Sequence, residues 1–253
     1  MFVSKMITYL ILAMAGLFAG LINSVADGGS FITFPAMIFT GVPSIIANAS
    51  STMALIPASV ASTWAYRDDL RELEGFPFRQ LLAVSVAGGA IGALLLLYTP
   101  QRTFDFVLPW LMFSATTLFA FGPQISRFLK PRVHIGVVTV VVIQLLISTY
   151  GGYFGGGVGI LMLATWTVFG VVDIRVLMAH RSVLGAAMNT IAVLLFIAAH
   201  KVWWPQTTIV LCTAVIGGYG GAWSAKRVDP RYVRAAITAI GVSITLVFFL
   251  RQR

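Results

Sequence analysis

The stretch Gly20-Leu-Ile-Asn-Ser-Val-Ala-Asp-Gly-Gly-Ser-Phe-Ile-Thr-Phe-Pro35 places a glycine cluster inside apolar sequence. A second cluster, roughly 129 residues further on, reads Tyr150-Gly-Gly-Tyr-Phe-Gly-Gly-Gly-Val-Gly-Ile-Leu-Met-Leu-Ala164. Glycine weakens a helix and lets the backbone turn. A helix break that recurs at a fixed distance indicates two related halves that together build one site.

The composition excludes a water-soluble domain. Of the 253 residues, 58% are hydrophobic and 10% are charged, and the mean hydropathy is +0.93. Soluble domains carry about 25% charged residues. The bilayer must therefore be the solvent. Because spanning segments must satisfy their own backbone hydrogen bonds, we expect an all-α polytopic membrane protein.

The net charge of +9 has a membrane explanation. Most Lys and Arg residues fall in short links between apolar runs, where they set topology and contact lipid headgroups. We therefore expect the lipid bilayer as a partner, and no nucleic acid. The single cysteine, Cys212, excludes a disulfide framework and a cysteine-based metal site. No cofactor or metal is expected.

The second and seventh of ten apolar segments are too short to span a bilayer, which needs about 20 residues. Both follow a glycine cluster. Paired short or interrupted segments are the best sequence indication of a transporter binding site. The expected segments are 6–26, 31–42, 44–66, 78–98, 103–125, 134–150, 158–170, 174–198, 205–224 and 231–250.

Matches at one constant offset divide the chain into two repeats, 1–130 and 131–253, within a single integral membrane domain. The repeats hold about five segments each. The matched pairs are Gly28 and Gly157, Gly41-Val42 and Gly170-Val171, Gly88-Gly89 and Gly217-Gly218, Gly92 and Gly221, and Arg102 and Arg231.

Two topologies fit this pattern. If all ten segments cross, each half has an odd number of crossings, so the halves are inverted and both termini lie outside the cytoplasm. If the two short segments re-enter, eight spans remain and the halves are parallel. In the first arrangement a larger share of the Lys and Arg residues lies on one side of the membrane. This distribution favours inverted repeats with eight to ten transmembrane helices, two of them short or broken.

Asp27 is the only acid within the first apolar block. An ionised carboxylate is costly in hydrocarbon, so an intramembrane acid is a functional candidate, here for proton coupling. The alternative is that Asp27 caps the short helix that begins near Ser30. The two roles are compatible.

The two glycine clusters are candidate substrate-binding elements. Where a helix breaks, backbone N–H groups and a helix N-terminus together form a site for an anion. Tight helix crossing is the alternative explanation of the glycines. The candidates are Gly28, Gly29 and Ser30 in the first half, with Gly156 and Gly157 in the second.

His180 and Arg181 lie about 10 Å along the eighth segment. Arg181 is permanently charged and suits an oxyanion, although it could instead snorkel to headgroups or pair with an acid. His180 can titrate near neutral pH and is a candidate for substrate contact and proton coupling, with packing as the alternative.

The corresponding place in the first half holds small hydroxyls. Ser51 and Thr52 can donate to a ligand or bond back to their own helix. Asn189 is a further candidate binding residue. Asn23 and Gln144 are weaker candidates, because hydrogen bonding between helices explains them as well.

These motifs resemble the TauE/SafE sulfite-exporter family, including its YfcA-like members. The resemblance covers nearly the whole chain and implies export of sulfite or organosulfur anions across the bacterial inner membrane. It rests on the order of Gly20-Leu-Ile-Asn-Ser-Val-Ala-Asp-Gly-Gly-Ser, Gly41-Val-Pro43, Ala49-Ser-Ser-Thr52, Gly155-Gly-Gly-x-Gly159, Ala179-His-Arg-Ser182 and Gly217-Gly-Tyr-Gly-Gly-Ala222.

The expectation is a multi-pass secondary transporter of a small oxyanion, sulfite or a short sulfonate, working by alternating access at a mid-membrane site between the repeats. A passive anion channel on the same scaffold and a transporter of another small anion are the alternatives. No H-E-x-x-H, G-x-S-x-G or paired catalytic carboxylates are present, so we do not expect an enzyme. The sequence leaves open a monomer or a homodimer.

Overall fold

The computed structural model describes residues 2–26, 28–71, 77–129, 136–168, 174–224 and 230–251. Within these ranges the chain forms α-helices, a 3-10 turn at Arg67–Asp69, and no strand. The helices are α1 (Phe2–Ala26), α2 (Ser30–Phe39), α3 (Ser44–Ala65), α4 (Phe78–Tyr98), α5 (Gln101–Leu129), α6 (Val137–Tyr153), α7 (Val158–Val168), α8 (Ile174–Ala198), α9 (Trp204–Ser224) and α10 (Pro230–Arg251).

The expected all-α polytopic fold is confirmed, and each apolar segment corresponds to one helix. Among the described residues, five helices are long and apolar enough to span a bilayer: α1, α3, α4, α5 and α8. The second and seventh helices, α2 and α7, have 10 and 11 residues. They are therefore too short to span, as expected.

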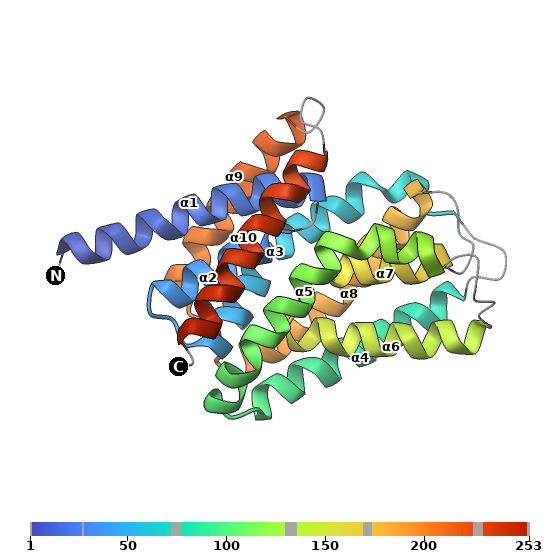
Figure 1. Cartoon of the computed structure of the whole chain (residues 1–253), viewed down its shortest axis with the longest axis horizontal. Helices are drawn as coiled ribbons and strands as arrows, with labels where there is room; N and C mark the ends of the chain where they lie inside the picture. The colour runs from blue at the N-terminus through green and yellow to red at the C-terminus, as the bar shows by residue number, and fades with distance from the viewer. Residues whose placement is uncertain are drawn as a thin grey trace.

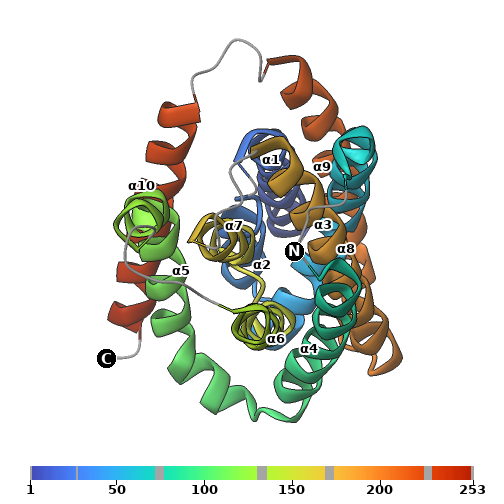
Figure 2. The same cartoon turned by 90° about the vertical axis from the view of Figure 1, so that its right-hand side faces the viewer.

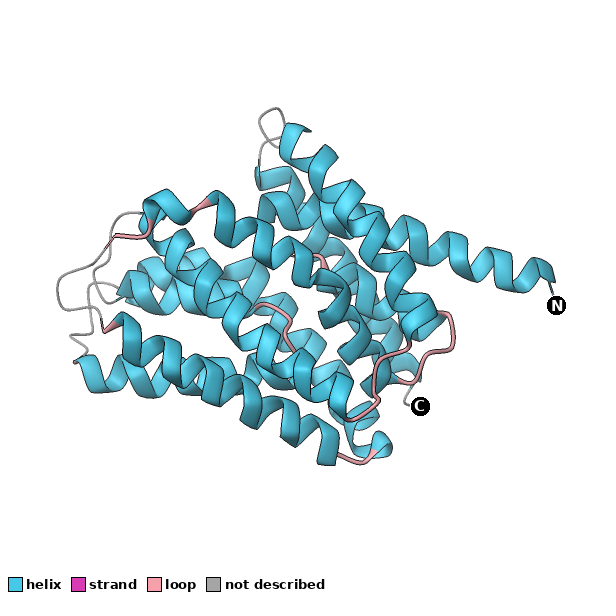
Figure 3. Cartoon of the chain, turned by 180° about the vertical axis from the view of Figure 1, so that it is seen from behind, coloured by secondary structure: helices cyan, strands magenta, loops and turns pink. Residues whose placement is uncertain are grey.

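Glycine makes the break between α6 and α7. Gly155 has a φ of +82° and Gly157 a φ of +77°, in the left-handed region that glycine enters without a steric penalty. The helix therefore stops at Tyr153 and restarts at Val158. Figure 3 shows such short non-helical links lying inside the helical body.

Each break turns a pair of helices back on itself. In Figure 1, α1 enters from the end of the molecule that carries both termini, and α2 returns toward that end. The hairpin of α6 and α7 enters from the opposite end. The two turns meet in the interior, where the ring centroids of Phe34 and Phe154 lie 5.7 Å apart.

The path of the chain combines features of the two topologies considered above. The short helices turn back, as in the eight-span arrangement, but the two hairpins enter from opposite ends, as inverted halves would. Both chain ends lie at one end of the molecule (Figure 1). The descent of the halves from one repeat stays a prediction.

The most extensive helix pairings join the two halves of the chain. Helix α1 packs along α9, and α4 packs along α6. Both pairs run parallel and meet at glycines that bring the backbones together. A Cβ at Gly20 or Gly217 would strike the backbone of Ala214 or Leu17, and a Cβ at Gly92 would strike that of Thr149.

Long helices surround the short helices α2 and α7. Figure 2, which looks along the molecule, shows α2 and α7 in the middle, with α5 and α10 on one side and α3, α4, α8 and α9 on the other. Helices α1 and α6 complete the hairpins and keep one exposed face each, at Leu10 and Leu146 for example. The breaks are therefore buried in protein, which non-helical backbone at membrane depth requires.

We expect Gly88→Val and Gly217→Val, at matched positions of the two parallel pairs, to destabilise the protein by similar amounts. Each added side chain meets backbone of the partner helix, and overpacking costs about 1–3 kcal/mol or more. Thermal unfolding in detergent measures the change. Gly136→Ala is the control because a Cβ there meets nothing within 4 Å. Equal stability of all three variants would contradict the close approach.

Candidate binding cavity at the helix breaks

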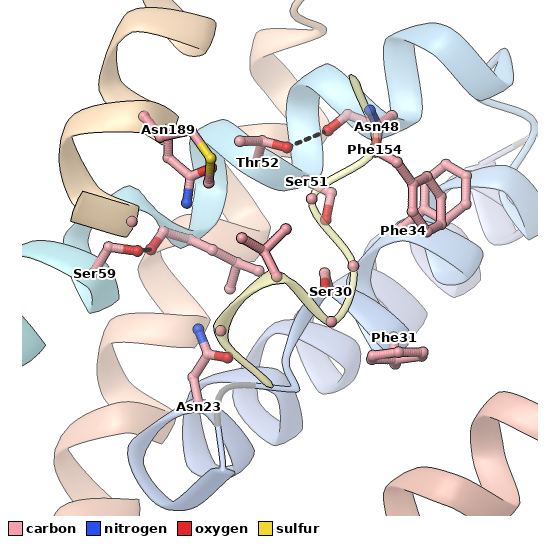
Figure 4. A pocket seen from close by; sticks show the side chains of 18 of the residues that line it. Asn23, Ser30, Phe31, Phe34, Asn48, Ser51, Thr52, Ser59, Phe154 and Asn189 are labelled. Atoms are coloured by element: carbon pink, nitrogen blue, oxygen red, sulfur yellow. Dashed lines mark hydrogen bonds between the residues drawn. The ribbon is translucent and has the colours of Figure 1, made fainter. Parts of the chain in front are cut away.

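A cavity of about 80 Å³ lies where the two hairpins meet (Figure 4). Its walls come from α1, α2, α3, α5, α7, α8 and the link 154–157. A single water needs about 10–15 Å³, so a small polyatomic ion or several waters can enter. The cavity thus joins residues from both halves of the chain.

Seven of the expected site residues line this cavity. Arg181 and Asn189 reach it from α8, and α3 supplies hydroxyls beside the glycine link of the second hairpin. The seven are Ser30, Ser51, Thr52, Gly156, Gly157, Arg181 and Asn189. The structure therefore brings together candidates that lie more than a hundred residues apart in sequence.

Three other candidates lie beside the cavity rather than in its wall. Gly28 and Gly29 are buried, and a Cβ would meet Ile237 at Gly28 and the Ala19 carbonyl at Gly29, so both positions are closely packed. His180 is 3% exposed, its Nδ1 lies 2.8 Å from the Val176 carbonyl, and its ring packs edge-on against Phe78. Asp27 lies outside the described residues.

Two helix N-termini face the cavity. Ser30 begins α2, and Val158 begins α7 directly after the left-handed Gly157. In α2 the N–H groups of Phe31, Ile32 and Thr33 donate to carbonyls of the preceding turn, and in α7 those of Ile160 and Leu161 do the same. The helix dipole still adds partial positive charge at both N-termini. With the guanidinium of Arg181 in the same wall, the electrostatics favour a small anion.

Side-chain hydrogen bonds hold the wall in shape. The Tyr150 hydroxyl donates to the Gly156 carbonyl at 2.8 Å and fixes the second turn. The amide of Asn48 donates to the Tyr153 carbonyl at 3.0 Å. Ser51 and Thr33 hydroxyls are 2.6 Å apart, and the Thr52 hydroxyl donates to the Asn48 carbonyl at 2.9 Å, leaving its oxygen as an acceptor.

Asn23, one of the weaker candidates in the sequence, lines the cavity. The backbone N–H of Gly29 donates to the Oδ1 atom of Asn23 at 2.8 Å. This hydrogen bond shows which end of the Asn23 amide is the oxygen and which is the nitrogen. The donor end, Nδ2, is thus left for the cavity, opposite Asn189 (Figure 4). In the sequence, Asn23 was visible as an amide side chain one turn before a helix break. That pattern alone does not distinguish a residue that contacts a ligand from one that packs between helices.

Aromatic side chains close the cavity toward the end that carries the termini. Phe31 and Phe34 of α2 line it together with Phe154. Behind them Phe34 packs against Phe248, which also stacks on Phe39 with ring centroids 6.2 Å apart. This side is a packed apolar barrier.

The opposite side continues into a second space of about 60 Å³, here called the vestibule. Asn23, Ser59, Arg181, Gly185 and Asn189 line both spaces. The vestibule extends past them to Ser62 and Ser182, whose hydroxyls lie 3.0 Å apart. Because Ser62 stands near the end of α3, the vestibule points toward the molecular end next to Arg67.

The architecture defines a class: a helical multi-pass membrane protein with a polar cavity between two inward-turning hairpins. Comparison of sequences gives the family. The chain matches the family described as "Sulfite exporter TauE/SafE" over residues 12–248. It therefore belongs to the TauE/SafE family of membrane transporters, which confirms the resemblance seen in the motifs.

The relatives span nearly the same length. "Probable membrane transporter protein ORF9" of a Sinorhizobium species is 26% identical, covering 93% of this chain and 90% of its own. A "Probable membrane transporter protein" of Haemophilus influenzae is 25% identical, with 93% and 92% covered. "Probable membrane transporter protein YfcA" of Escherichia coli is 23% identical, with 91% and 85% covered.

We expect Asn23→Asp to keep the fold and lose anion affinity. Aspartate still accepts from the Gly29 N–H, but it removes the Nδ2 donor and adds a negative charge to the cavity. Loss of a hydrogen bond to a charged ligand costs about 1.5–3 kcal/mol, or roughly tenfold or more in affinity for a bound anion.

A thermal-shift titration with sulfite on purified protein measures this affinity, since a ligand of the native state raises its apparent stability. Gln144→Glu is the matched control, because Gln144 donates its amide to the hydroxyls of Ser85 and Ser148, lies outside the cavity wall, and should lose stability instead. If Asn23→Asp kept its sulfite response, a purely structural role for Asn23 would follow.

Proposed function

We propose that this protein is a secondary transporter that carries a small oxyanion, sulfite or a short sulfonate, across the bacterial inner membrane. The observation that carries the proposal is the convergence of two helix N-termini and Arg181 on one cavity between the hairpins. The description of the family as sulfite exporters supports the choice of anion.

In this proposal the substrate oxygens lie against the turn at Gly156 and Gly157, where glycine lets the backbone approach without a side chain in the way. Arg181 neutralises the charge of the anion. Ser51, Thr52 and Asn189 orient it, and Ser30 faces it from the start of α2. All of these residues line one cavity.

The orientation in the membrane follows from charge. Arg67, Arg71, Arg79 and Arg175 flank the helix ends on the side toward which the vestibule points. The positive-inside rule assigns this side to the cytoplasm. The anion then enters from the cytoplasm, and alternating access requires the aromatic barrier around Phe34 and Phe154 to open on the other side.

We expect Arg181→Ala to lose about 10- to 100-fold in oxyanion uptake, because a charge-assisted hydrogen bond is worth about 1.5–3 kcal/mol. Uptake of sulfite into proteoliposomes measures this. Arg67→Ala is the control for loss of a cation, since Arg67 is exposed and stacks on Trp64 at 4.4 Å. Near-normal transport by a folded Arg181→Ala protein would remove Arg181 from the site.

Proton coupling by Asp27 or His180 belongs to the same proposal. We expect an imposed pH gradient to drive uptake, and Asp27→Asn or His180→Gln to abolish that response while downhill exchange continues. The measurement is sulfite flux with and without the gradient. Flux that ignores both the gradient and Asp27→Asn would mean that the transporter is not proton-coupled through this acid.

A further inference from the structure

Gly185 stands at the junction of the binding cavity and the vestibule. It lines both spaces, as do Arg181 and Asn189. The three residues follow one another at intervals of four along α8, so they share one face of the helix. Gly185 thus leaves a space without a side chain between Arg181 and Asn189, at the passage from the vestibule to the binding cavity.

Packing does not explain this glycine. A Cβ at most of the other glycines within helices, among them Gly88, Gly92, Gly151 and Gly217, would press on a neighbouring helix. At Gly185 a Cβ meets no atom within 4 Å. Glycine inside a helix is about 1 kcal/mol less favourable than alanine, so this position carries a cost in stability that no close contact requires.

We propose that Gly185 keeps the passage between the vestibule and the binding cavity open and thereby determines the size of anion that reaches the site. The proposal deepens the proposed function and rests on it for the identity of the cargo. The shape of the passage itself is independent of which anion is carried.

Helix geometry says how a side chain at this position would act. Cα–Cβ bonds tilt toward the N-terminus of a helix, so a side chain covers the turn before its own Cα. A side chain at position 185 would therefore lie over Arg181 and fill the space between the two cavities. A methyl group would narrow the passage, and a leucine side chain would block it.

The first experiment measures transport and stability together on Gly185→Ala and Gly185→Leu. Wild-type protein is first tested for uptake of sulfite, methanesulfonate and butanesulfonate into proteoliposomes. The uptake of each anion by the variants is then compared with that of the wild type. We expect Gly185→Ala to unfold about 2–4 °C higher, yet to lose the largest anion that the wild type carries by roughly tenfold or more. Gly185→Leu should lose all of them.

Gly136→Leu is the control, because a Cβ there also meets open space but Gly136 does not line the cavity. Its uptake should match the wild type. Higher stability of Gly185→Ala with unchanged uptake of every anion, together with normal uptake by Gly185→Leu, would overturn the proposal.

The second experiment measures access through the passage by cysteine labelling, without any substrate. In a Cys212→Ala background, single cysteines replace Thr52, which lines only the cavity, and Ser62, which lines only the vestibule. A negatively charged methanethiosulfonate reagent labels each in detergent. We expect Gly185→Leu to slow labelling at position 52 by about tenfold or more and to leave position 62 unchanged.

The two experiments separate the two ideas. If the wild type carries none of the three anions, the proposed cargo is wrong, and the labelling rates still decide the role of Gly185. Unchanged labelling at position 52, or equal slowing at both positions, would overturn the passage, because neither result is produced by a block between the two spaces.

Discussion

Every backbone N–H and C=O group in a hydrocarbon layer needs a partner, and each one without a partner costs several kcal/mol. The rest of this structure follows from that constraint. Two helices break at membrane depth, so the breaks must be surrounded by protein. The long helices therefore surround the breaks, and glycines such as Gly92, whose added Cβ would strike Thr149, let neighbouring helices approach closely.

The same constraint makes the cavity polar. Breaking a helix exposes backbone groups, and only some are satisfied locally. Tyr150 bonds the Gly156 carbonyl in one hairpin, and Asn23 bonds the Gly29 N–H in the other. Each tie spans six residues and fixes the shape of its turn. The first residues of α7, Val158 and Gly159, line the cavity beside Arg181. The positive end of the helix dipole therefore lies where the helix is interrupted, and it favours an anion there.

The helices could be predicted from the sequence because apolar run length and glycine position control them directly. Seven residues of the cavity wall were also predicted, since Arg181 and the hydroxyls of α3 are unusual in apolar helices. The sequence did not separate His180 from Arg181: neighbouring helical residues differ by about 100° in direction, so His180 packs against Phe78 while Arg181 lines the cavity. The roles of Asn23 and Gly185 depend on a hydrogen bond across a turn and on open space, which no sequence pattern contains.

The pairing of α1 with α9 and of α4 with α6 has a consequence for how such a chain could arise. The first helix of each half finds its main partner in the other half, so neither half could bury its own hairpin alone. If the halves descend from one repeat, as the sequence predicts, a half-length ancestor needed a second, inverted copy of itself to bury its hairpin. Joining the two copies in one chain would then fix their one-to-one ratio and let the two halves diverge, so that Arg181 has no charged counterpart in the first half.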